Sequence, residues 1–259
     1  MSKQHTDPTR RATLALLVGG AGAALGGCGS VLQAAAGDPP RLFRLSSKNT
    51  YPDTVPVVDW QLVVETPSAP ASVNTNRIGL MESAFRFNYF AKANWVDRAP
   101  VMVQNLIIES FDNSNAIVGV GPASIGLRPN FVLQPELREF QAHHVGDAHE
   151  VFVVINARLI QMPERKIVAV EQFSRKMKAP VGMLDPVIDA FDDTLGKVMK
   201  RLVVWTLEEG EEAWKAQLAA QKSGSSGRSR RKSSGSSSGK PAAAPNRPIR
   251  RLSRPKAAS

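Results

Sequence analysis

A single cysteine, Cys28, determines which part of this 259-residue chain can belong to a folded domain. Before it, several basic residues are followed by the apolar segment 12–25, an arrangement typical of a bacterial export signal. A helix over that segment would be about 21 Å long, too short for the roughly 30 Å hydrocarbon core of a bilayer. We therefore predict that residues 1–27 are a signal peptide and that the mature chain begins at Cys28.

The residues directly before the cysteine predict that it is lipidated. Leu25, Gly26, Gly27 and Cys28 resemble the lipobox at which bacterial lipoproteins are cut, with Gly26 as a departure at the second position. Two or more acyl chains anchor a protein that one chain holds only marginally. The alternative is a buried structural cysteine after an alanine-rich helix, but each glycine in such a helix costs roughly 1 kcal/mol relative to alanine.

Two other motifs in the leader are incomplete. Gly20 and Gly22 have the first spacing of a dinucleotide-binding loop, but Leu25 stands where the third glycine belongs, and no strand precedes them. Residues 9–14 resemble a twin-arginine export signal, although Thr13 stands where that motif prefers phenylalanine. The sequence therefore leaves the export route open.

The formal net charge of +10 belongs to the C-terminal part of the chain. Residues 222–259 contain eleven Lys and Arg and no acidic residue, which leaves the rest of the chain nearly neutral. Because this part is also rich in Ser, Gly, Pro and Ala, we expect residues 215–259 to be a disordered basic tail. Its partner would be an anionic envelope polymer or lipid headgroups rather than nucleic acid, and the alternative is a solubilising extension without a partner.

Residues 28–40 are predicted to be a lipidated tether and residues 41–214 a single domain. Periodicity predicts strands and helices in this domain. Strands are expected at 41–45, 57–65, 77–81, 85–90, 116–120, 130–141, 149–161 and 166–177, and helices at 98–111 and from 185 to near 207. We therefore predict an α+β fold in which a mixed, mostly antiparallel sheet packs against two main helices.

Several residues carry specific structural expectations. Asp97 is expected to cap the helix at 98–111, with Pro100 in its first turn. Phe85 is expected to line one side of its strand together with Phe87 and Tyr89. Pro135 predicts a sheet edge or a bulge within its strand.

Over residues 41–207 the sequence resembles the ABC-type transport auxiliary lipoprotein family. The order and spacing of several stretches carry this resemblance. They are FRFNYF at 85–90, NWVDRAP at 94–100, VQNLIIES at 103–110, ELREF at 136–140, RKIVAVEQF at 165–173 and FDDTLGKVMKRLVVWTL at 191–207.

The resemblance implies a periplasmic lipoprotein that works with an ABC permease, its ATPase and a substrate-binding protein of the mammalian-cell-entry (MCE) type. Such systems are taken to move lipids or other hydrophobic compounds between the two membranes. Gly29 and Ser30 follow the cysteine where an aspartate would favour the inner membrane, so we expect the outer membrane. Assembly into a homo-oligomer stays open.

The folded part offers no catalytic motif, and we expect neither enzymatic activity nor a cofactor. Residues 143–150, HHVGDAHE, are interpreted as a hairpin turn around Gly146 and Asp147 rather than a metal site. Asp192 and Asp193 are interpreted as part of a solvated helix face. Trp214 is the one tryptophan that core packing does not explain, so an apolar groove for lipid is kept as an alternative.

We therefore expect a non-enzymatic, lipid-anchored transport subunit. The main alternative is an envelope- or peptidoglycan-binding lipoprotein in which the basic tail is the binding element, and an uncharacterised lipoprotein enzyme is a third. Cys28 is the one residue to which the sequence assigns a function.

Overall fold

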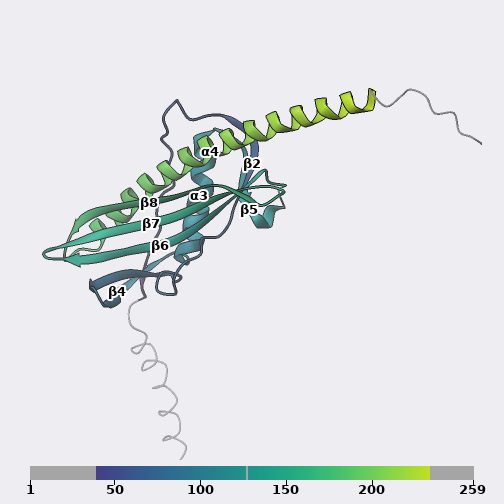
Figure 1. The fold of residues 1–259 in the computed structure, drawn as a ribbon. Coiled ribbons are helices and arrows are strands. Elements are labelled where there is room, and N and C mark those ends of the chain that lie inside the picture. The colour runs from purple at the N-terminus through teal and green to yellow at the C-terminus, as the bar shows by residue number, and fades with distance from the viewer. Residues whose placement is uncertain (1–38, 127, 234–259) are drawn as a thin grey trace, which may run out of the picture. The chain divides into compact units, whose positions relative to one another are not determined.

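The computed structural model describes residues 39–126 and 128–233 (Figure 1). The chain divides into two compact units after Ala213. No helix in these two ranges is both long and apolar enough to cross a membrane. The first unit contains the sheet. In chain order the elements are β1 (Arg41–Phe43), β2 (Val58–Val64), β3 (Arg77–Ser83), β4 (Arg86–Trp95), α3 (Ala99–Ser114), β5 (Ile117–Pro122), the 3-10 turn η1 (Ala123–Ile125), β6 (Phe131–Val145), β7 (Ala148–Gln161), β8 (Lys166–Pro180) and α4 (Asp185–Ser233).

The eight strands form one mixed sheet, and the strand β6 is its centre. One edge of β6 pairs antiparallel with β7 along its whole length, and β7 pairs in the same way with β8. The other edge is shared by two parallel partners, β2 at residues 131–133 and β3 at residues 141–143. Strand β4 then pairs with β3, β1 with β4, and β5 with β2.

Because one edge of β6 is divided between two partner strands, the strand can contain a proline where neither partner pairs with it. Pro135 lies between the two stretches that pair with β2 and β3. There the loop residue Ser68 replaces a strand, because its N–H donates to the Pro135 carbonyl (3.2 Å) and its carbonyl accepts from the Leu137 N–H (2.8 Å). A bulge follows at Arg138. The expected interruption is therefore confirmed.

Helix α3 and the first part of α4, up to Ala213, lie on the same side of strands β6–β8, behind them in the view of Figure 1. The core forms between these helices and the sheet. Three aromatic rings meet there, since Phe191 of α4 packs 5.2 Å from both Trp95 of β4 and Phe140 of β6, measured between ring centroids. Strand β2 adds Trp60, Leu62 and Val64 to the core, all fully buried, while Asp59 is exposed. The predicted α+β fold with two main helices is thus the observed one.

Three local expectations were wrong. The N-cap of α3 is Arg98 and not Asp97, and its side chain makes no capping hydrogen bond. Phe85 lies in the turn between β3 and β4, where its side chain is fully exposed. Helix α4 does not end near Leu207 but continues to Ser233, so part of the segment expected to be an irregular tail is helical.

Candidate docking pocket on helix α3

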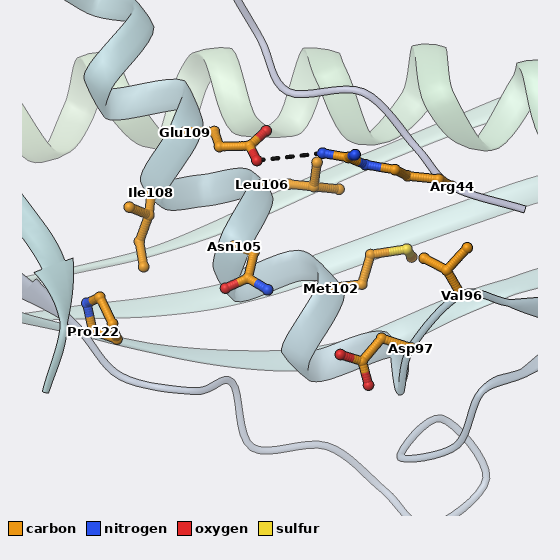
Figure 2. A pocket seen from close by; sticks show the side chains of 9 residues that line it. All are labelled: Arg44, Val96, Asp97, Met102, Asn105, Leu106, Ile108, Glu109 and Pro122. Carbon is orange, nitrogen blue, oxygen red and sulfur yellow. Dashed lines mark hydrogen bonds and ion pairs between the residues drawn. The ribbon is translucent and has the colours of Figure 1, made fainter. Parts of the chain in front are cut away.

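A pocket with a volume of about 570 Å³ lies along the outer side of helix α3 (Figure 2). We call it the α3 pocket. It is lined by Arg44, Val96, Asp97, Met102, Asn105, Leu106, Ile108, Glu109 and Pro122. Its volume falls in the range of ligand-binding sites, which are mostly apolar with a few placed polar groups.

Helix α3 positions the pocket because its opposite face is held firmly to the sheet. On that face Val103, Ile107 and Phe111 are fully buried. Gln104 fastens the helix further, because its side-chain amide donates to the Val64 carbonyl of β2 (2.9 Å). The outer face is therefore presented by a rigid element, as a binding surface requires.

The segment after β1 lies against the same helix. Its Tyr51 hydroxyl donates to the Ser110 carbonyl (2.8 Å), and the Lys48 N–H donates to the Ser110 hydroxyl (2.9 Å). Burial raises the pKa of Tyr51 to about 12, so this phenol stays protonated as a donor. These contacts place Arg44 beside the pocket.

The floor of the pocket is apolar. Met102 and Leu106 are nearly buried, with exposed fractions of 4% and 2%. Val96 at one end is 50% exposed, and Ile108 and Pro122 point toward one another at the other end in Figure 2. An occupant would gain about 25 cal/mol for each Å² of apolar surface that it removes from water. Because Met102 and Leu106 are already buried, that surface belongs mainly to Val96, Ile108 and Pro122.

The rim of the pocket is polar and carries charge at both ends. The Arg44 guanidinium pairs with the Glu109 carboxylate at 3.4 Å, with both side chains largely in solvent. Asp97, at the other end, accepts a hydrogen bond from the Arg98 N–H (2.6 Å) and forms no ion pair within the described residues. Figure 2 shows Asn105 between the two ends, and its side-chain amide has no hydrogen-bond partner within the described residues.

The C-terminal end of α3 is electronegative. The last turn has no basic residue to compensate the negative end of the helix dipole. Burial raises the pKa of Asp112, and the nearby Glu109 carboxylate raises it further. A cation from an occupant would relieve this repulsion.

A smaller pocket of about 280 Å³ lies between β8 and the first unit's part of α4. Phe173 and Trp205 meet there edge to face with ring centroids 5.5 Å apart, and the Arg201 guanidinium lies 5.6 Å from the Phe173 ring. Because Arg201 also lies 4.0 Å from Glu171, its charge already has a partner. With about half the volume of the α3 pocket, this smaller pocket is the weaker candidate.

Most residues singled out in the sequence have structural positions away from the α3 pocket. Cys28 and the other lipobox residues, Leu25, Gly26 and Gly27, lie outside the described residues. Residues 143–150 form the β6–β7 hairpin turn with Gly146 at φ 57°, as expected. In residues 39–126 and 128–233, no cluster of three or more His, Cys, Asp or Glu has the arrangement of a metal site.

Of the two helix-face aspartates, Asp193 behaves as interpreted, whereas Asp192 makes a tertiary contact. Asp193 pairs with Lys197 at 3.3 Å, one turn later on α4. Asp192 accepts from the Ser46 N–H (2.6 Å) and so holds the segment after β1. Arg44, Asn105 and Glu109 were not predicted from the sequence as pocket residues. The sequence feature that could have indicated a binding surface on this helix is Ile108, an apolar residue outside its buried face.

A comparison with family models identifies residues 43–203 as an ABC-type transport auxiliary lipoprotein component. This match covers more than half of the chain. The chain belongs to this family. The matched region contains strands β6 to β8, the whole of α3 and the first part of α4. The resemblance proposed from the sequence is therefore confirmed at the level of the family.

Solved structures show the same fold. A Xanthomonas campestris protein assigned to the DUF330 family is similar with a TM-score of 0.63 and 24% identity, over 68% of this chain and 99% of that one. A second, uncharacterised protein gives a TM-score of 0.52 and 13% identity, over 64% and 97%. PelC of Paraburkholderia phytofirmans, a dodecamer, reaches 0.37 at 12% identity over 57% and 92%, a likeness too low to argue from. A search of curated proteins gave no significant match.

Proposed function

We propose that this protein is a lipid-anchored, non-catalytic auxiliary subunit of an ABC-type transport system in the bacterial periplasm. The family match over residues 43–203 is the observation that carries the proposal. The predicted lipobox, which lies outside the matched region, supports it independently. In this proposal Cys28 holds the domain at the outer membrane.

The α3 pocket supports a role in contact rather than in catalysis. Its polar lining residues are Arg44, Asp97, Asn105 and Glu109, and Arg44 already pairs with Glu109. What it offers is an apolar floor with charged ends, which suits the binding of a segment of protein. The transport energy would then come from the partner ATPase.

The finer part of the proposal concerns the cargo and the partners. We propose that the system moves lipids or other hydrophobic compounds and includes an ABC permease, an ATPase and an MCE-type substrate-binding protein. A lipoprotein held near the outer membrane would let such a cargo cross the aqueous gap while shielded from water.

Affinity purification from the native bacterium tests this proposal. We expect the tagged full chain, and a variant lacking residues 234–259, to retain the permease, the ATPase and the binding protein in equal amounts. Retention on anionic cell-wall material instead, lost when the tail is removed or salt is raised, would favour the envelope-binding alternative. A tagged lipoprotein of another family from the same membrane serves as the control.

A further inference from the structure

The α3 pocket has a complementary segment in the chain's own sequence. We propose that the pocket binds residues 248–255 of the C-terminal tail of a second copy of this chain. The proposal uses the lipid anchor of the proposed function, since copies that share one membrane surface meet at high local concentration. It goes beyond that function because it assigns a role to the tail.

The segment differs in composition from the rest of the tail. Ile249 and Leu252 are the only large apolar residues between positions 222 and 259. Arg250, Arg251 and Arg254 stand beside them. A solubilising tail needs no such cluster, whereas an apolar floor with acidic ends would bind it.

The spacing in this segment fits the polyproline II conformation, which proline residues favour. Pro248 and Pro255 flank the segment. With three residues per turn, Ile249, Leu252 and Pro255 would fall on one edge of the bound segment. That edge would cover the apolar side chains of the pocket that are still accessible, Val96, Ile108 and Pro122.

The lengths of the segment and the pocket also agree. Six steps of about 3.1 Å from Ile249 to Pro255 give roughly 19 Å in a polyproline II helix. On α3, ten steps of about 1.5 Å from Ala99 to Glu109 give roughly 15 Å, and Asp97 lies two residues before the helix. A polyproline II backbone has no internal hydrogen bonds, so its carbonyls would be free to accept from the Asn105 amide.

Charge favours the same occupant. Helix α3 contains no Lys or Arg, and it carries Glu109 and Asp112 near its negative end. The pocket also presents Asp97 at its other end, where no ion pair is found within the described part of the chain. An arginine of the segment would meet the Asp97 carboxylate at one end, and at the other end a second arginine would exchange with Arg44 for the Glu109 carboxylate.

A peptide titration tests whether the segment binds this pocket. A fluorescent peptide with the sequence of residues 246–257 is added to the chain from residue 28 onward, carrying Cys28→Ser so that lipidation plays no part. We expect saturable binding that weakens at least tenfold when Ile249 and Leu252 of the peptide are both serine. Binding should also weaken at least fivefold in 0.5 M salt.

Matched charge variants of the protein locate the binding site. Asp97→Asn with Glu109→Gln should weaken peptide binding at least fivefold. The control, Asp147→Asn with Glu164→Gln, removes two exposed carboxylates from the β6–β7 and β7–β8 turns and should change nothing. Equal binding by the two double variants, or by the peptides with and without Ile249 and Leu252, would overturn the proposal.

A crosslinking experiment tests the second copy. One full chain carries Asn105→Cys and another carries Ser253→Cys, both in the Cys28→Ser background, and the mixture is oxidised. We expect the mixed disulfide dimer to form at least ten times faster than with Ser238→Cys, a tail control. If a chain that carries both Asn105→Cys and Ser253→Cys forms the disulfide only within one molecule, the proposed contact between two copies is overturned. Neither result bears on lipidation or on the transport partners, which the purification tests separately.

Discussion

The tightest packing among the described glycines is at Gly210 on α4. A Cβ atom added there would lie 2.5 Å from Cζ2 of Trp60, whose side chain is fully buried. The ring also packs against Phe131, with centroids 4.8 Å apart, so it has little room to move. Only a residue without a side chain lets the helix approach the sheet this closely.

Gly210→Ala should therefore destabilise the protein although alanine is the better helix former. Overpacking a core costs about 1–3 kcal/mol, which exceeds the gain of about 1 kcal/mol in helix propensity. Gly196→Ala on the same helix is the matched control, because its Cβ would meet nothing within 4 Å. Urea unfolding should show opposite signs for the two variants, and equal effects would contradict the packing argument.

His149 gives the domain a predictable response to mild acid. Burial lowers the pKa of this imidazole, and the nearby His144 lowers it further. The unfolded chain takes up the proton near the ordinary pKa of about 6.5, while the folded chain resists until lower pH. Stability should therefore be full above pH 6.5 and fall as the pH drops below it.

The variant His149→Phe should remove this pH dependence. The ring already packs edge to face with Phe90, and its Nδ1 has no hydrogen-bond partner to lose. Unfolding free energies measured between pH 7.5 and 5.5 check this. The carboxylate Glu136 loses its charge only at lower pH, because its hydrogen bond from Asn156 lowers its pKa, so it does not contribute in this window. An equal slope in both proteins would show that another group is responsible.

At the scale of elements, the N-cap of α3 is a position that was predicted wrongly from the sequence. Asp97 is a good capping residue, but the helix starts one position later, and Asp97 bonds to the Arg98 N–H instead. The tertiary contact of the Ala99 N–H with the Thr75 carbonyl (3.0 Å) fixes this start. Capping preference is a local signal, and a contact 24 residues away along the chain overrode it.

A substitution at the true N-cap should improve the helix. Arg98→Asp places a carboxylate where it can accept from the Val101 N–H, since Pro100 has no N–H to offer. The control Arg98→Ala loses the same hydrogen bond to Asn74 without gaining a cap. Arg98→Asp should be more stable than Arg98→Ala by about 0.5–2 kcal/mol in thermal unfolding. Equal stability would show that no cap forms.

Strands and helices of the sheet were largely predictable because their periodicity is strong. Val151 to Leu159 alternate along β7, and the buried side chains follow that alternation. The division of one edge of β6 between β2 and β3 was not predictable, since pairing depends on distant segments. The α3 pocket was missed for the same reason, because Arg44 and Glu109 come together only in the fold.

At the scale of the whole molecule, the proposed anchor predicts where the protein is found. Cys28→Ala should yield a chain without acyl groups, because the thiol that carries them is gone. Mass spectrometry of the mature N-terminus and fractionation of membranes check this. The control Ser30→Ala should remain acylated and in the membrane fraction, and an acylated Cys28→Ala chain would contradict the lipobox.

Among the strands of residues 39–126 and 128–233, only β6 pairs both with β3, which continues to β4 and β1, and with β2, which continues to β5. The described chain enters the sheet at β1, on the side where the proposed tether would begin. A mechanical pull on that tether would therefore pass from β1 to β4 and β3, and would reach β2 within the sheet only along the backbone of β6. Strand β6 would thus carry the part of the load that passes through the sheet, while the hydrogen bonds of Ser46 to Asp192 and of Lys48 to Ser110 would pass another part to helices α4 and α3.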